Sequence, residues 1–154
     1  MRKQSKLFWT LVLVLYVLFI FHNSATVAVE SARQSGNVLV TAKEVLSRLG
    51  IPNGWLTEHL VRKTAHFLEY SLYGGLLWKC LGVHGLCGRL RVVTHLWLGM
   101  LVPFVDETIQ LFTEGRSGQI SDVWLDMSGM LTGTCMAAVA ALMIHFFRGR
   151  SKGK

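Results

Sequence analysis

The amino-acid sequence predicts an all-α integral membrane protein: a four-helix bundle with an extracytoplasmic interfacial amphipathic helix, forming one domain over residues 1–154. Of the 154 residues, 51% are hydrophobic and only 16% are charged. The hydrophobic residues form blocks, and three of the later blocks are long enough for the roughly 20 helical residues that cross a membrane. Much of the net charge of +7 lies beside these blocks. Membrane topology explains that distribution better than nucleic-acid binding.

The first predicted span covers residues 7–22 and follows a basic amino terminus, which is predicted to be cytoplasmic. Small residues around Ala25 and Ala28 resemble a signal-peptidase site, so a cleaved segment is an alternative. Three further spans follow in the sequence, and they favour a retained membrane anchor.

Residues 24–61 are predicted to form an extracytoplasmic segment. From Val38 to Leu49, apolar residues recur at helical spacing and charged residues occupy the other positions. This pattern is typical of an amphipathic helix that rests on the membrane surface. Gly50 is predicted to end the helix. A small helix packed on the bundle is the alternative interpretation.

The remaining spans are predicted at residues 64–83, 92–112 and 122–147. Basic residues follow the second span and the last span, whereas the connection between the third and fourth spans holds only Arg116. Because basic connections stay in the cytoplasm, both termini of this multi-pass cell-membrane protein are predicted to be cytoplasmic.

Ionisable residues inside the predicted spans indicate a functional site, because a charge at the membrane centre costs roughly 2.5 to 3.5 kcal/mol. On each of the last three spans, polar residues recur at the spacing of one helix face and lie in the outer half of the span. We expect these faces to meet in a polar pocket that opens outward. The candidate catalytic residues are His66, Glu69, Asp106, Glu107, Asp122 and Asp126, and the candidate substrate-binding residues are Arg62, Lys63, Tyr70, Gln110, Arg116 and Ser117.

Small residues extend the acidic face of the last span. Gly129 and Gly133 follow Asp122 and Asp126 on the same helix face. Small residues four positions apart allow two helix backbones to approach closely. The last span is therefore predicted to touch a neighbouring helix along this face.

Other interpretations of the polar residues remain open. The network could simply hold the helices together in lipid. His66, Glu69, Asp122 and Asp126 are residue types that bind divalent ions, but they show no known ligand spacing, and no metal or other cofactor is predicted.

The turn before the last span has its own alternatives. Ser117 or Ser121 could act as a nucleophile activated by His66, but no elbow motif frames either serine. Arg116, between Gly115 and Gly118, could offer its guanidinium group to a phosphate, or the turn could be an ordinary loop.

Four short motifs occur in order in the last two thirds of the chain. They are an Arg-Lys-x-x-His-x-x-Glu-Tyr block at 62–70, an Asp-Glu-x-x-Gln block at 106–110, a Gly-Arg pair at 115–116, and the aspartates Asp122 and Asp126. In these motifs the chain resembles the VanZ-like family of small bacterial membrane proteins. The resemblance implies a four-span protein of the cell envelope, in a family named for a member that gives low-level resistance to teicoplanin-type glycopeptide antibiotics. It implies no particular reaction.

Three functions are compatible with these observations. The first is a site that binds or acts on an anionic membrane lipid or a lipid-linked cell-wall intermediate, with Arg62, Lys63 and Arg116 holding phosphate. The second is a small proton-coupled transporter or flippase, which would have to be a homo-oligomer because four spans without a repeat are few for a monomeric transporter. The third is a non-enzymatic partner or regulator of another envelope protein.

Overall fold

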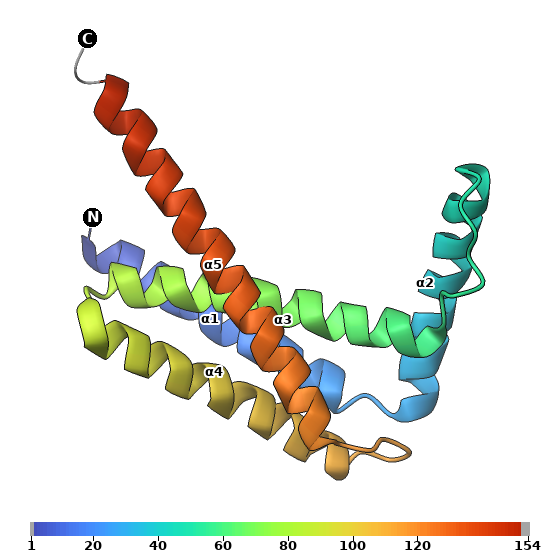
Figure 1. Ribbon diagram of the computed structural model, residues 1–154. Coiled ribbons are helices and arrows are strands. Elements are labelled where there is room, and N and C mark those ends of the chain that lie inside the picture. The colour runs from blue at the N-terminus through green and yellow to red at the C-terminus, as the bar shows by residue number, and fades with distance from the viewer. Residues whose placement is uncertain (1, 152–154) are drawn as a thin grey trace.

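The computed structural model describes residues 2–151 and contains five α-helices and no strand in that range, which confirms the all-α prediction (Figure 1). The helices are α1 (Arg2–Ser24), α2 (Ala28–Arg48), α3 (Glu58–Val83), α4 (Gly88–Leu111) and α5 (Ile120–Ser151).

Three of the described helices, α1, α4 and α5, are long and apolar enough to cross a membrane. The sequence predicts four spans, and α3 is the one that lacks the required composition. Its 26 residues reach about 39 Å, so length does not exclude it. Polar residues such as Arg62, Lys63 and Glu69 lower its hydropathy instead.

The central helix of the molecule is α3. It contacts all four other helices, and its contact with α5 is the most extensive. Figure 1 shows α1, α3 and α4 running side by side, with α5 crossing them obliquely and α2 turned across one end. Tyr70, Tyr73 and Leu77 of α3 pack in the core with Ile20 of α1 and Met130 of α5. Neighbouring helices therefore cover much of α3, which allows it to carry polar residues.

The backbones of α3 and α5 touch where they cross. A Cβ atom at Gly129 would collide with the carbonyl oxygen of Phe67, and one at Gly133 would collide with that of Ser71. These contacts confirm the predicted close approach of the last span to a neighbour. They also hold the first turns of α5 at a fixed distance from the part of α3 that carries the polar residues.

The helix predicted around Val38 begins earlier, at Ala28, and extends to Arg48. Its first turn is supported by the connection between α4 and α5, because the backbone N–H of Ala28 donates to the carbonyl oxygen of Glu114 at 3.1 Å. The Ser- and Gly-containing start of this helix therefore depends on a tertiary contact that local sequence does not reveal. Gly50, with φ of +69°, follows the helix end as predicted.

The chain termini and the connections between helices are divided between two ends of the molecule. The amino terminus, the α3–α4 connection and the carboxyl end of α5 lie at one end, whereas α2 and the α4–α5 connection lie at the other (Figure 1). Two basic residues on which the topology prediction depends, Lys152 and Lys154, lie outside the described residues.

Candidate functional site

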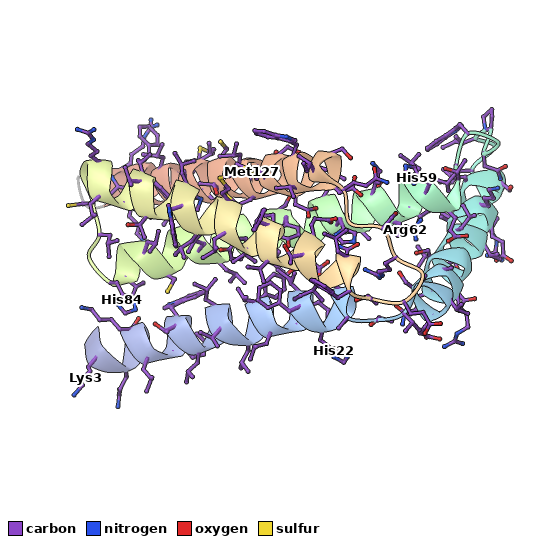
Figure 2. The ribbon with its side chains drawn as sticks, turned by 90° about the horizontal axis from the view of Figure 1, so that it is seen from below. Lys3, His22, His59, Arg62, His84 and Met127 are labelled. Carbon is purple, nitrogen blue, oxygen red and sulfur yellow. The ribbon has the colours of Figure 1, made fainter. Side chains whose placement is uncertain are left out.

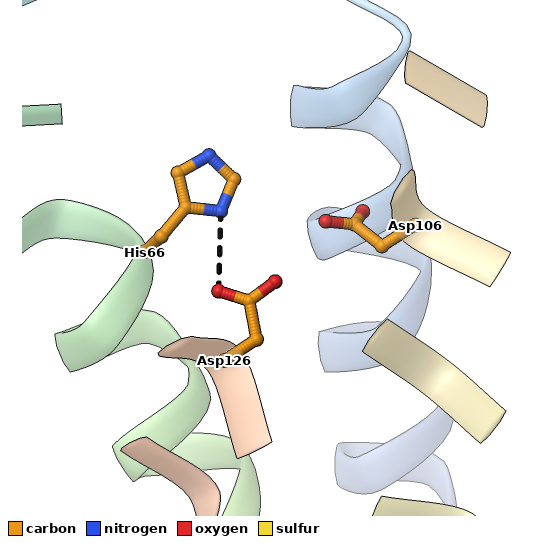
Figure 3. A group of neighbouring side chains, drawn as sticks. All are labelled: His66, Asp106 and Asp126. Atoms are coloured by element: carbon orange, nitrogen blue, oxygen red, sulfur yellow. Dashed lines mark ion pairs between the residues drawn. The ribbon is translucent and has the colours of Figure 1, made fainter. Parts of the chain in front are cut away.

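Three helices bring three ionisable side chains together. The residues are His66 on α3, Asp106 on α4 and Asp126 on α5. One imidazole nitrogen of His66 and one carboxylate oxygen of each aspartate lie within 4.8 Å of one another. Figure 3 shows the imidazole above the Asp126 carboxylate, with Nδ1 of His66 3.7 Å from Oδ1 of Asp126, and the Asp106 carboxylate pointing toward them. We call these residues the three-helix cluster. The expected convergence of polar faces is confirmed for these residues.

The aspartates of the three-helix cluster are buried without adequate hydrogen bonds. Asp106 and Asp126 are both 0% exposed. Within the described residues, neither carboxylate oxygen of Asp126 has a hydrogen-bond partner, and Oδ1 of Asp106 has none. Oδ2 of Asp106 accepts a long bond of 3.4 Å from Nε2 of Gln110, and the hydroxyl groups of Ser24 and Tyr70 lie close to this carboxylate. Because an unsatisfied buried carboxylate is costly, this cluster requires a compensating proton or cation.

Tyr70 on α3, a predicted substrate-binding residue, is completely buried in the hydrophobic core between the helices. Its buried hydroxyl lies close to the Asp106 carboxylate, although it makes no hydrogen bond of good geometry with the described residues. Tyr70 is therefore enclosed within the protein.

A second acidic group is fully bonded. Glu107 on α4 accepts hydrogen bonds from Nε2 of Gln110 at 2.9 Å and from the backbone N–H of Gln119 at 2.9 Å, one on each carboxylate oxygen. We call Glu107, Gln110 and Gln119 the loop anchor, because they join the end of α4 to the turn that starts α5. Glu107 is a predicted catalytic residue and Gln110 a predicted substrate-binding residue, and these contacts connect both of them to the turn before α5.

Glu69 is held by Asn23, a residue outside the predicted site. Nδ2 of Asn23, at the end of α1, donates to Oε1 of Glu69 at 2.9 Å. The hydroxyl of Tyr16 donates to the backbone carbonyl of Glu69 at 2.9 Å. The available signal for Asn23 was its position as a polar residue directly after an apolar block.

Among the predicted site residues that the structure describes, one lysine and one aspartate form an ion pair. Nζ of Lys63 lies 3.0 Å from Oδ1 of Asp122, and the two side chains are 35% and 28% exposed. Such a partly exposed pair contributes at most about 1 kcal/mol. Ser117, on the α4–α5 connection, is exposed.

Arg116 makes a different contact from the one expected. It donates from Nη2 to Oγ of Ser31 on α2 at 2.7 Å, and Ser31 was not recognised as a site residue. In the part of the chain that the structure describes, neither Arg116 nor Arg62 has a carboxylate at ion-pair distance. Burial lowers the pKa of Arg116 and the nearby Arg62 lowers it further, whereas the charges of Asp106, Glu107 and Glu69 act in the opposite direction. A guanidinium nevertheless remains protonated in proteins, so both side chains are cations without a carboxylate in direct contact.

A cavity of about 600 Å³ lies between α1, α2 and α3, beside the α4–α5 connection. Arg62, His66, Glu69 and Arg116 line its polar part. Figure 2 shows Arg62 near the start of α3, where this helix meets α2. Apolar side chains from α1, α2, α3 and the α2–α3 connection line much of the remainder, namely Phe19, Val38, Ala42, Leu56, Val61, Ala65 and Leu68.

A family model described as VanZ/LLP1 matches residues 7–143. The match contains every residue of the three-helix cluster, the loop anchor and the cavity lining. No curated protein and no solved structure matches the chain.

Proposed function

This chain belongs to the VanZ/LLP1 family, and on that premise we propose that it binds an anionic amphiphile of the bacterial cell envelope, such as a lipid-linked cell-wall intermediate. The three apolar helices and the family match support a membrane protein of the VanZ-like type, and the family suggests a link to glycopeptide resistance. The proposed ligand binds in the cavity between α1, α2 and α3. Binding there would contribute to tolerance of teicoplanin-type antibiotics.

The observation that carries this proposal is the pair of arginines at the polar part of the cavity. Arg62 and Arg116 are half-buried, line the same cavity and have no carboxylate at ion-pair distance among the described residues. Arginine binds phosphate and carboxylate groups through charge-assisted hydrogen bonds. A head group with negative charge would therefore compensate both side chains.

The shape and lining of the cavity support an amphiphile over a small soluble anion. Beyond the arginines, Phe19, Val38 and Leu68 provide an apolar surface next to the polar groups. An acyl or prenyl chain can cover this surface while its head group remains at Arg116. A ligand with both parts gains apolar burial in addition to ionic contacts.

The proposed topology has four spans, with α3 crossing the membrane beside α1, α4 and α5 and both termini in the cytoplasm. Two observations support this topology. The amino terminus, the α3–α4 connection and the end of α5 lie at one end of the molecule (Figure 1), and these segments carry basic residues, which favour the cytoplasmic side. With this orientation the cavity opens at the outer surface.

We propose that α2 lies on the extracytoplasmic surface of the cell membrane. Val45 of α2 and Leu49, directly after it, are 51% and 67% exposed, and Trp55 in the following connection is 59% exposed. Lipid would cover these apolar side chains, and Trp is enriched at the membrane interface.

Glu69 is the acidic residue that we propose contacts the bound head group. It lines the cavity with the arginines, and its Oε1 is oriented by Asn23. His66 lines the same cavity. These two are the candidate catalytic residues with access to a ligand, and they would exchange protons with the head group in any turnover.

Native mass spectrometry of the purified protein tests the proposal. The probes are phosphatidylglycerol, which is anionic, and phosphatidylcholine, which has no net charge. We expect selective retention of phosphatidylglycerol, and a loss of affinity of about 10- to 100-fold in Arg116→Gln, because hydrogen bonds to charged groups contribute about 1.5 to 3 kcal/mol.

Arg33→Gln is the matched control, since Arg33 is an exposed arginine of α2 that pairs with Glu30 at 2.8 Å. It should bind phosphatidylglycerol as the wild type does. Equal retention of the two lipids, or equal losses in Arg116→Gln and Arg33→Gln, would contradict the proposal.

A further inference from the structure

We propose that the three-helix cluster of His66, Asp106 and Asp126 binds one divalent transition-metal ion, with Zn²⁺ and Mn²⁺ as the ions that best fit its donors. The sequence predicts no metal, because no ligand motif is present. The three donors come from three different helices, so a short sequence motif could not reveal them.

The distances agree with one shared ion. Zn²⁺ holds nitrogen and oxygen ligands at roughly 2.0 to 2.2 Å, which separates two ligands of one ion by roughly 3 to 4 Å. Nδ1 of His66 and Oδ1 of Asp126 are already 3.7 Å apart. The ligand atoms of the whole cluster lie within 4.8 Å of one another. Small side-chain rotations would complete the geometry without movement of the helices.

The unsatisfied oxygens provide a second, independent observation. Both oxygens of the completely buried Asp126 and Oδ1 of Asp106 have no partner in the described part of the protein. A buried carboxylate needs hydrogen bonds, a positive charge or a metal ion. Lys63 pairs with Asp122, and among the described residues neither Arg62 nor Arg116 lies at ion-pair distance from Asp106 or Asp126. The protein itself therefore supplies no full ion pair to either aspartate.

The donor set fits the charge and chemical class of the ion. Two carboxylates and a neutral imidazole carry a charge of −2, which one divalent ion neutralises. Imidazole favours ions such as Zn²⁺, and carboxylates also suit Mn²⁺. Nε2 of Gln110 approaches Oδ2 of Asp106 at 3.4 Å, which would leave Oδ1 for the ion and orient the carboxylate.

The cluster is accessible from one side. His66 belongs both to the cluster and to the lining of the cavity. Three protein ligands and one open position are typical of catalytic zinc sites. The open position would accept water or a phosphate oxygen from the cavity. This last step rests on the proposed lipid function, whereas ion binding itself does not.

Metal titration of the purified protein tests the inference. The full chain is treated with a chelator, equilibrated with Zn²⁺ or Mn²⁺, and analysed by calorimetry and elemental mass spectrometry. We expect one bound ion per chain in the wild type and a loss of affinity on the order of 100-fold in Asp126→Asn and Asp106→Asn. Asp122→Asn is the control, because Asp122 lies one turn from Asp126 and pairs with Lys63.

A spectroscopic measurement on the wild type covers the case in which the aspartate variants fail to fold. Co²⁺ should give visible absorption bands typical of nitrogen and oxygen coordination, and these bands should change in His66→Gln. His66 is 20% exposed, so this substitution perturbs the core less than a change of either aspartate. Unchanged bands in His66→Gln would overturn the assignment of the ligands.

The remaining outcomes are decisive as well. A wild type that retains no ion, or equal affinity in Asp126→Asn and Asp122→Asn, would overturn the proposal and indicate that the buried carboxyl groups are protonated. Arg116→Gln should lose phosphatidylglycerol and keep the ion. A failure of lipid binding is therefore distinguishable from a failure of metal binding.

Discussion

The loop anchor and the three-helix cluster are neighbouring acidic regions with opposite hydrogen-bonding states. Glu107 has a donor on each oxygen, whereas Asp106, the preceding residue on α4, has one weak bond and Asp126 has none. Burial is similar, since Glu107 is 5% exposed and both aspartates are 0% exposed. Burial of an acid therefore does not by itself define its role. A satisfied acid stabilises the fold, and an unsatisfied acid requires a ligand or a proton.

The largest expected effect is on the loop anchor. Glu107→Ala should lower the free energy of unfolding by about 3 kcal/mol or more, because it removes two hydrogen bonds and leaves buried donors without partners. The measurement is denaturant unfolding in detergent, followed by tryptophan fluorescence. Glu44→Ala, at an exposed position of α2, should change stability by less than about 0.5 kcal/mol. Similar losses in both variants would show that Glu107 is not an anchor.

A substitution at the α3–α5 crossing should disturb the three-helix cluster selectively. Gly133→Ala forces a Cβ atom toward the carbonyl oxygen of Ser71, so we expect a loss of about 1 to 3 kcal/mol and weaker metal retention. The matched control is Gly36→Ala in α2, where a Cβ atom would meet no heavy atom within 4 Å. That control should gain up to about 1 kcal/mol from helix propensity. Equal stability of the two variants would contradict the close contact.

The three-helix cluster should respond to metal in a way that the loop anchor does not. In chelator, Asp126→Asn should change stability by less than about 1 kcal/mol, because it removes a charge that no donor stabilises. At an ion concentration 100 times the dissociation constant, the wild type should gain about 2.7 kcal/mol and the variant almost nothing. Thermal unfolding with and without Zn²⁺ measures this difference, and an equal shift in both proteins would remove the distinction between the regions.

The smallest effect is expected at the exposed edge of the site. Lys63→Gln removes the ion pair with Asp122, whose side chains are partly exposed, and should cost at most about 1 kcal/mol. The loss should diminish as salt is added, since salt screens exposed charges. A salt-independent loss above 2 kcal/mol would mean that this pair belongs with the buried groups.

The helical nature of the chain and the meeting of three polar faces could be predicted because both follow from local periodicity. The positions of His66, Asp106 and Asp126 on their helices are sufficient to direct them toward one interior. The identity of their partners could not be predicted. The bond from Asn23 to Glu69 spans 46 positions in the sequence, and the bond from Arg116 to Ser31 spans 85.

The helix α3 shows a second limit of sequence reasoning. Its hydrophobic residues and length favoured a span, but its composition is too polar for it to be counted among the apolar helices. Its polar groups are accommodated because α1, α4 and α5 pack around it. Hydropathy measures the compatibility of a segment with lipid, and it does not include the neighbours that replace lipid in the folded protein.

The polarity of α3 has a consequence for biosynthesis in the proposed topology. Because α3 is polar, it is not expected to move by itself from the insertion machinery into the lipid bilayer. The apolar α1 can do so soon after it is made. Ribosome-bound α3 would have to wait for α4 and α5, so membrane entry and assembly would be one coupled event. Chains truncated before α5 should then leave α3 accessible to degradation by membrane proteases.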